Sequence, residues 1–137
     1  MNKPVVVLSN NDGCIVSRSD EAKDAGIPMA APFFESRSLI NLHDIAVFSS
    51  NYNLYGDLSW RVMETLRMIT GKENVEVYSV DEAFVDLSAV PVKELPAMAK
   101  KIKETVEKWS GISVSIGVAP TKTLAKLANY IAKKDKK

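Results

Sequence analysis

The sequence predicts an α+β fold, a two-layer arrangement in which an antiparallel or mixed sheet is covered by helices and a small subdomain precedes it. Two observations predict it. From Tyr52 onward, the apolar pattern gives the order helix, strand, strand, helix, strand, helix, which lacks only the first strand of a ferredoxin-like βαββαβ unit. The first fifty residues do not continue that order, and we expect them to form a small lobe of their own.

The small lobe is predicted to begin with a strand at residues 4–9, because this stretch contains a short, valine-rich run that is typical of an interior strand. Residues 10–13 supply turn residues after it. Ser19 is a candidate N-cap for a short helix that Gly26 ends. A second short helix is expected over residues 33–39.

The second part of the chain is predicted to begin with a long amphipathic helix over residues 52–69, in which apolar side chains recur at helical spacing and which Gly71 ends. Residues 75–79 and 83–87 are short runs rich in valine, tyrosine and phenylalanine. Asp81 and Glu82 separate them, so we expect a tight hairpin.

A second long helix is predicted over residues 92–109, with a charged outer face and Gly111 at its end. Residues 113–118 alternate between polar and apolar side chains, which predicts a strand. Residues 121–133 have one apolar side and are expected to form a third helix.

The first strand of the ferredoxin-like unit has three candidates. Residues 5–9, residues 46–49, or a segment that precedes Met1 could each fill that position. Because the chain passes into a strand almost at its first residue, we expect it to be a fragment of a longer protein.

Composition and charge exclude several classes of protein. The chain of 137 residues has 18 Lys+Arg and 17 Asp+Glu, so its overall charge provides no attraction for nucleic acid or membranes, and such contacts require a local patch. Hydrophobic residues at 46% and charged residues at 26% disfavour disorder and collagen-like repeats. The single Cys14 suits a reducing, cytoplasmic compartment. No apolar run approaches the roughly 18 residues of a membrane span.

Asp81 and Glu82 are the first candidate site, because the hairpin sets two adjacent carboxylates between core-type residues. Like-charge repulsion and desolvation would protonate one of them unless a cation lies there. Neighbouring side chains on a strand point to opposite faces, so the turn must redirect the two carboxylates if they share a metal. Mg²⁺ uses one or two carboxylates together with water and substrate phosphates, which suits an open site. The alternative is an exposed turn with two solvated acids.

Residues 117–126 are the second candidate site, in which a strand leads through a loop into a helix that begins near Thr121 and carries Lys122 and Lys126. Helix N-termini with a nearby lysine favour phosphate. The glycines of a P-loop are absent from this stretch. The alternative is a capped helix with a solvated basic face.

Residues 16–23 are the third candidate site. They place the hydroxyl of Ser17 and the ammonium group of Lys23 a turn or two apart, and such a cluster could bind phosphate oxygens. The alternative is the polar first turn of an ordinary helix.

Together these segments resemble the Y-family translesion DNA polymerases, and most closely their UmuC-type catalytic subunits. The matching segments span nearly the whole chain and occur in the same order as in the family. The resemblance favours the functional interpretation of each candidate site. The segments that carry it are residues 3–14 (KPVVVLSNNDGC), 21–27 (EAKDAGI), 48–52 (FSSNY), 78–84 (YSVDEAF) and 117–129 (GVAPTKTLAKLAN).

The resemblance implies a fingers subdomain over residues 1–50 and part of a palm subdomain over residues 51–137. It implies template-directed nucleotidyl transfer in DNA repair and damage tolerance, as part of an SOS response. The implied partners are a DNA primer-template, deoxynucleoside triphosphates and, in a full-length protein, accessory SOS-type subunits and a sliding clamp.

The same resemblance implies roles for individual residues. Asp81 and Glu82 match the paired catalytic carboxylates of a two-metal Mg²⁺ site, with Asp81 touching both ions and Glu82 the ion that activates the primer 3′ hydroxyl. Ser17 and Lys23 match fingers residues that contact the incoming triphosphate, and Lys126 matches a palm lysine that reaches the same phosphates. Lys23 stands where many relatives carry arginine. The lysine offers phosphate a point charge in place of the bidentate contact of a guanidinium group.

A further metal-binding aspartate, the thumb and an additional DNA-binding domain are expected in the family but not found in this sequence. We therefore expect the polypeptide alone to be inactive. Two other functions remain open. One is a non-catalytic module that binds nucleotide or a partner, with an exposed sheet edge that favours oligomers. The other is a ferredoxin-like nucleotidyl cyclase or regulatory domain.

Overall fold

The computed structural model describes residues 3–134 and divides into two compact units, unit 1 (Met1–Asn53) and unit 2 (Leu54–Lys137). Each unit is described by itself. Both units combine helices with a small sheet, as the predicted mixed fold requires. Among the residues described, no helix is both long and apolar enough to cross a membrane. The assignment of residues 1–50 to fingers and 51–137 to palm stays a prediction.

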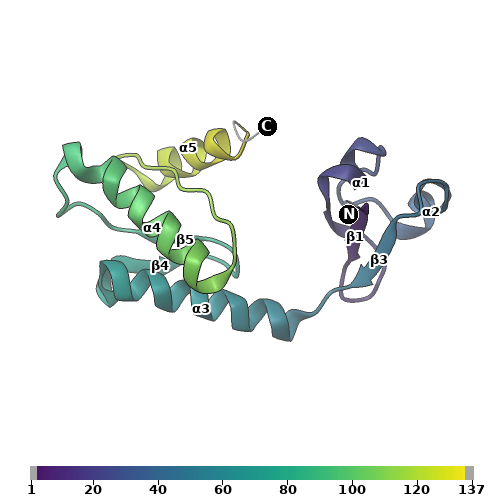
Figure 1. Cartoon of the computed structure of the whole chain (residues 1–137), viewed down its shortest axis with the longest axis horizontal. Coiled ribbons are helices and arrows are strands. Elements are labelled where there is room, and N and C mark those ends of the chain that lie inside the picture. Colours follow the sequence, from purple (N-terminus) through teal and green to yellow (C-terminus); the bar gives the residue numbers. More distant parts are fainter. Residues whose placement is uncertain (1–2, 135–137) are drawn as a thin grey trace. The chain divides into compact units, whose positions relative to one another are not determined.

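Unit 1 is a three-stranded sheet with two short helices (Figure 1). β1 is the central strand, antiparallel to β2 and parallel to β3. This pairing follows from the sequence, because β1 is the most apolar of the three strands and alternates half-buried and buried residues. The elements are β1 (Val5–Leu8), β2 (Ile15–Arg18), β3 (Ala46–Ser49), α1 (Asp20–Asp24) and α2 (Phe33–Leu42).

The core of unit 1 lies between the sheet and its helices. Ser19 ties the two layers together, because its Oγ accepts hydrogen bonds from the backbone N–H of Ala22 in α1 at 3.2 Å and of Val5 in β1 at 3.1 Å. The predicted N-cap is therefore confirmed. The buried core side chains are Val6, Leu8, Ile15, Ala22, Ile27, Ile40 and Ile45.

The sequence predicted no strand over residues 15–18, which form β2, so the third candidate site begins on a strand and continues into α1. Neither residues 5–9 nor residues 46–49 supply a first strand to the ferredoxin-like sheet, because β1 and β3 pair with each other in unit 1. The pairing satisfies the backbone groups of both strands inside their own unit.

Unit 2 consists of two long helices, a two-stranded hairpin and a third helix (Figure 1). Its core joins Met63 and Leu66 of α3 to Ile102 and Val106 of α4, and the apolar sides of β4 and β5 pack against it. The elements are α3 (Tyr52–Thr70), the 3-10 turn η1 (Lys72–Asn74), β4 (Val75–Val77), β5 (Ala83–Val85), the 3-10 turn η2 (Val92–Glu94), α4 (Leu95–Ser110) and α5 (Lys122–Lys134).

The strand predicted over residues 113–118 is wrong, because this segment has no ladder partner among residues 3–134. Polar side chains of α4 bind its backbone instead. The Val114 N–H donates to Glu107 Oε1 at 3.2 Å, and Lys103 Nζ donates to the Val114 carbonyl at 3.0 Å. The alternating pattern agrees with the partly buried side chains of Val114 and Ile116, which pack against the core of unit 2. A strand also requires a neighbouring strand with which to form hydrogen bonds.

Gly117 brings this extended segment into direct contact with α5. A Cβ atom at Gly117 would lie 2.2 Å from the backbone nitrogen of Asn129 and 2.4 Å from the carbonyl oxygen of Ala125. Only glycine permits so close an approach of two backbones. Because no residue of α5 is fully buried, this backbone contact is a main determinant of where α5 lies in unit 2.

Candidate functional site

The hairpin turn places Asp81 and Glu82 next to each other outside the strand ladder. Val77 pairs with Ala83 at its base, and the N–H groups of Tyr78 and Ser79 both donate to the Glu82 carbonyl at 3.0 Å. Ser79 Oγ donates to Asp81 Oδ1 at 2.7 Å. Both carboxylates therefore belong to the turn, and the strict alternation of a strand does not apply to them.

Lys126 reaches the turn from α5. Its Nζ lies 3.2 Å from Glu82 Oε2 and 4.5 Å from the centre of the Tyr78 ring. Both partners of the ion pair are about half exposed, at 45% for the lysine and 42% for the glutamate. Water competes for such a pair, so it can be exchanged for another contact.

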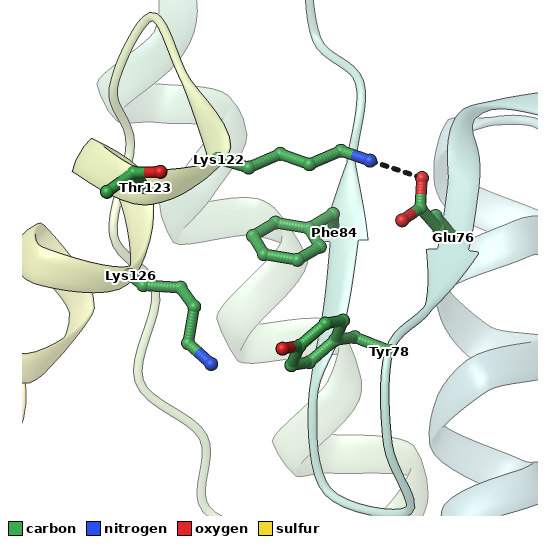
Figure 2. Close-up of a pocket in the computed structure, with 6 residues that line it drawn as sticks. All are labelled: Glu76, Tyr78, Phe84, Lys122, Thr123 and Lys126. Carbon is green, nitrogen blue, oxygen red and sulfur yellow. Dashed lines mark hydrogen bonds and ion pairs between the residues drawn. The ribbon is translucent and has the colours of Figure 1, made fainter.

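Lys122 repeats this arrangement one helical turn earlier (Figure 2). Its Nζ lies 2.5 Å from Glu76 Oε2 and 5.3 Å from the centre of the Phe84 ring. The rings of Tyr78 and Phe84 meet edge to face, with centroids 5.4 Å apart. Lys122 and Lys126 thus each lie over one aromatic ring and beside one glutamate of the hairpin.

These side chains line a shallow pocket of about 280 Å³ between the hairpin and α5. Two lysines and one glutamate, Glu76, line it, and the rings of Tyr78 and Phe84 give it apolar surface. An anion that entered would find two ammonium groups within reach near the N-terminal end of a helix, which favours negative charge. The lining residues are Glu76, Tyr78, Phe84, Lys122, Thr123 and Lys126.

Asp81 and Glu82 fit an open magnesium site better than a closed one. Among residues 3–134, no group of three or more His, Cys, Asp or Glu side chains is arranged to hold a metal ion. Two exposed or half-exposed carboxylates at one turn are the donor set that Mg²⁺ uses when water and substrate phosphates complete its coordination. The donors present thus fit the predicted ion, with further ligands required from outside the hairpin.

Ser17 and Lys23 lie in unit 1. Ser17 is exposed on β2, opposite Val7 of β1. Lys23 Nζ on α1 forms an ion pair with Asp20 Oδ1 at 2.6 Å. The structure therefore brings Glu82 and Lys126 into contact and sets Asp81 beside them, and it places Ser17 on β2 and Lys23 on α1 in the other unit.

Tyr78, Phe84 and Glu76 were not among the site residues that the sequence predicted. A signal was present. Glu76 lies on β4, and Tyr78 comes two residues later, directly after the end of the strand. Glu76 is the cross-strand partner of Phe84, so continued alternation places all three on one face of the hairpin. Lys122 and Lys126 are four residues apart on a helix, which places them on one face as well.

The chain is similar to known proteins over nearly its full length. The family described as impB/mucB/samB matches residues 1–130. Protein UmuC of Salmonella typhimurium is 48% identical over 133 residues, which cover 96% of this chain and 31% of that protein. DNA polymerase IV of Staphylococcus aureus is 32% identical over 138 residues, covering 97% of this chain and 37% of that one. The chain thus spans about a third of the length of these relatives.

Solved structures agree with the sequence relatives. DinB from Sulfolobus solfataricus superposes with a TM-score of 0.83 at 26% identity, over 94% of this chain and 38% of that one. A structure described as an insertion ternary complex of Dbh DNA polymerase superposes with a TM-score of 0.82 at 26% identity, over 94% of this chain and 39% of that one.

Proposed function

The chain belongs to the impB/mucB/samB family, and from that premise we propose that it supplies part of the catalytic core of an error-prone translesion DNA polymerase. The reaction is template-directed nucleotidyl transfer, in which a primer 3′ hydroxyl attacks the α-phosphorus of a deoxynucleoside triphosphate and pyrophosphate leaves. One observation carries the proposal. The hairpin holds Asp81 and Glu82 at a single turn, and Lys126 reaches that turn at 3.2 Å from the Glu82 carboxylate.

Asp81 and Glu82 would hold Mg²⁺, which supplies positive charge against the triphosphate and activates the 3′ hydroxyl. We assign contact with both metal sites to Asp81 and contact with the hydroxyl-side metal to Glu82. Ser79 orients Asp81 through the 2.7 Å hydrogen bond to Oδ1, which leaves the other carboxylate oxygen for a cation. The chain contributes position and charge and no covalent intermediate.

Lys126 would bind the phosphates of the incoming nucleotide, and Ser17 and Lys23 would contact them from the fingers. Lys23 is partly neutralised by Asp20 at 2.6 Å. To bind phosphate, the ammonium group of Lys23 must first break its ion pair with Asp20. It therefore binds phosphate more weakly than the bidentate guanidinium group of an arginine does. A loose grip of this kind suits a polymerase that accepts damaged templates.

Residues 1–50 are proposed as the fingers subdomain and residues 51–137 as part of the palm. The partners proposed for the whole protein are a DNA primer-template, deoxynucleoside triphosphates, accessory SOS-type subunits and a sliding clamp, in the cytoplasm. Support comes from the relatives named as UmuC and DNA polymerase IV and from the Dbh ternary complex. A cyclase-like domain leaves the first fifty residues unexplained, whereas the polymerase structures cover 94% of the chain.

Titration of the isotopically labelled chain with a deoxynucleoside triphosphate and Mg²⁺ tests the site. We expect nuclear magnetic resonance shifts at Lys23, Asp81 and Lys126 together. The double variant D81N/E82Q should lose the metal-dependent part of the shifts. The control E104Q, which removes an exposed carboxylate from α4, should keep it. Silence at all three residues would contradict the proposal.

Primer extension separates catalysis from binding. We expect the 137-residue chain to extend no primer with Mg²⁺, because its formal charge of +1 offers DNA little electrostatic attraction and the described residues hold no cluster of three metal-ligating side chains. Nucleotide binding without extension would also fit the second candidate, a non-catalytic nucleotide-binding module. Efficient extension by this chain would contradict our expectation.

A further inference from the structure

We propose that Lys126 and a divalent metal ion compete for the Glu82 carboxylate, so that metal loading releases Lys126 to bind phosphate. The inference rests on the proposed function, because it concerns the same carboxylate and the same lysine. It adds a binding order to the proposed site. Lys126 stays paired with Glu82 until the metal ion binds, and only then can it bind phosphate.

The competition follows from the geometry of the ion pair. Lys126 Nζ lies 3.2 Å from Glu82 Oε2, so a metal ion bound to the same oxygen would lie close to the ammonium group. Metal–oxygen bonds of about 2.1 Å for Mg²⁺ would bring a doubly charged ion against the ammonium group. Two cations so close repel each other strongly. One carboxylate oxygen therefore cannot serve both at full strength.

The pair is weak enough to be exchanged. Both side chains are about half exposed, and pairs of this kind add little to stability because water solvates each partner. Lys126 retains a second contact after exchange, since the Tyr78 ring lies 4.5 Å from Nζ. A ring attracts the ammonium group without using a carboxylate. Tyr78 is therefore a positioning residue that keeps Lys126 at the turn.

Lys122 provides a matched control. It lies on the same helix, four residues before Lys126, and has the same kinds of partner, Glu76 at 2.5 Å and the Phe84 ring at 5.3 Å. Its glutamate belongs to β4, and not to the turn that carries Asp81 and Glu82. Removal of Lys122 changes the charge of the pocket as much as removal of Lys126 does, but it frees no proposed metal ligand.

The test measures the affinity of the chain for Mg²⁺ without nucleotide. Binding is monitored through the nuclear magnetic resonance signals of the carboxylate and backbone groups of Asp81 and Glu82. We expect K126M to bind Mg²⁺ about two- to fivefold more tightly than the wild type, the factor that corresponds to the loss of one half-exposed ion pair. K122M should change the affinity by a clearly smaller factor. Equal effects of the two substitutions, or none, would overturn the inference and leave the proposed function standing.

A second measurement follows Lys126 itself. During the Mg²⁺ titration the side-chain signals of Lys126 should move as its ion pair with Glu82 breaks. The upfield shift that the Tyr78 ring causes at the ε protons of Lys126 should persist. That shift should survive in Y78F and vanish in Y78L. Immobile Lys126 signals at metal saturation would overturn the inference. If Mg²⁺ causes no shift at Asp81 or Glu82 in any variant, the proposed function itself fails.

Discussion

Ser19 shows how one side chain can join two elements of unit 1. Its Oγ accepts from the Ala22 N–H, which caps α1, and from the N–H of Val5, the first residue of β1. The hydroxyl is half-buried, so water replaces it only in part. The sequence predicted the cap from residue type, and the bond to β1 depends on the folded lobe.

S19A should destabilise the chain by about 1–2 kcal/mol, because it removes a cap and leaves two backbone donors without their acceptor. Urea unfolding followed by circular dichroism measures the loss. S38A is the control, since Ser38 is exposed within α2. Equal stabilities of S19A and S38A would contradict this role of Ser19.

Glu107 shows how a surface carboxylate can fix a loop. The ammonium group of Lys103 and then the Val114 N–H hold the pKa of Glu107 down, from 4.5 to about 2. The Ser113 hydroxyl donates to the same oxygen at 3.0 Å. The ionised carboxylate is thus the form that holds residues 113 and 114 against α4.

This carboxylate predicts an acid-sensitive contribution to stability. The unfolded chain takes up the proton near pH 4.5 and the folded chain only near pH 2, so the contribution is complete above pH 4.5 and is lost as the pH falls toward 2. E107Q should flatten the stability profile over that range, measured by urea unfolding at each pH. E104Q is the control on the same helix, and an unchanged slope in E107Q would contradict the prediction.

At the scale of elements, the hairpin and α5 form the site because their faces meet, and Gly117 determines how closely. The segment before α5 makes no strand ladder among the described residues, so close backbone contact replaces hydrogen-bonded pairing. Tyr78 and Phe84 then face Lys126 and Lys122 of α5. A change at Gly117 should therefore affect both stability and the site.

G117A should cost about 1–3 kcal/mol, because its methyl group would lie 2.2 Å from a backbone nitrogen of α5 and the helix must shift. The shift should also weaken the contact between Lys126 and Tyr78, which the ring-current shift of the lysine reports. G56A is the control, since a Cβ at Gly56 in α3 meets no atom within 4 Å. Wild-type stability in G117A would contradict the described packing.

At the scale of the whole molecule, the chain has two separate hydrophobic cores. Ile15 is fully buried in the core of unit 1 and Ile102 is 3% exposed in that of unit 2. The two cores share no residue. Each unit therefore has its own source of stability.

I15A and I102A should each cost about 2–5 kcal/mol, through lost burial and the cavity left behind. Hydrogen exchange measured amide by amide should show faster opening in unit 1 for I15A and in unit 2 for I102A. Each variant serves as the control for the other. Uniform acceleration along the chain in both variants would show that the two cores unfold as one.

Both small sheets also leave strand edges without a ladder partner among residues 3–134. Edges of this kind favour pairing with another chain, and Phe48 on β3 is 57% exposed. We expect the chain to self-associate as its concentration rises, which light scattering measures. F48K should reduce the association, because a charge at an edge opposes pairing, whereas a strict monomer at high concentration would contradict the prediction.

The sequence by itself determined the long helices α3 and α4, the hairpin with its two carboxylates, and the Ser19 cap, because periodicity, turn residues and capping are local properties. Only the tertiary structure decided that β1 pairs with β3, that residues 113–118 bind α4, and that Lys122 and Lys126 each lie over an aromatic ring of the hairpin. These features depend on which distant segments become neighbours. Local pattern specifies the face that a segment presents, and the choice of partner depends on packing across the whole chain.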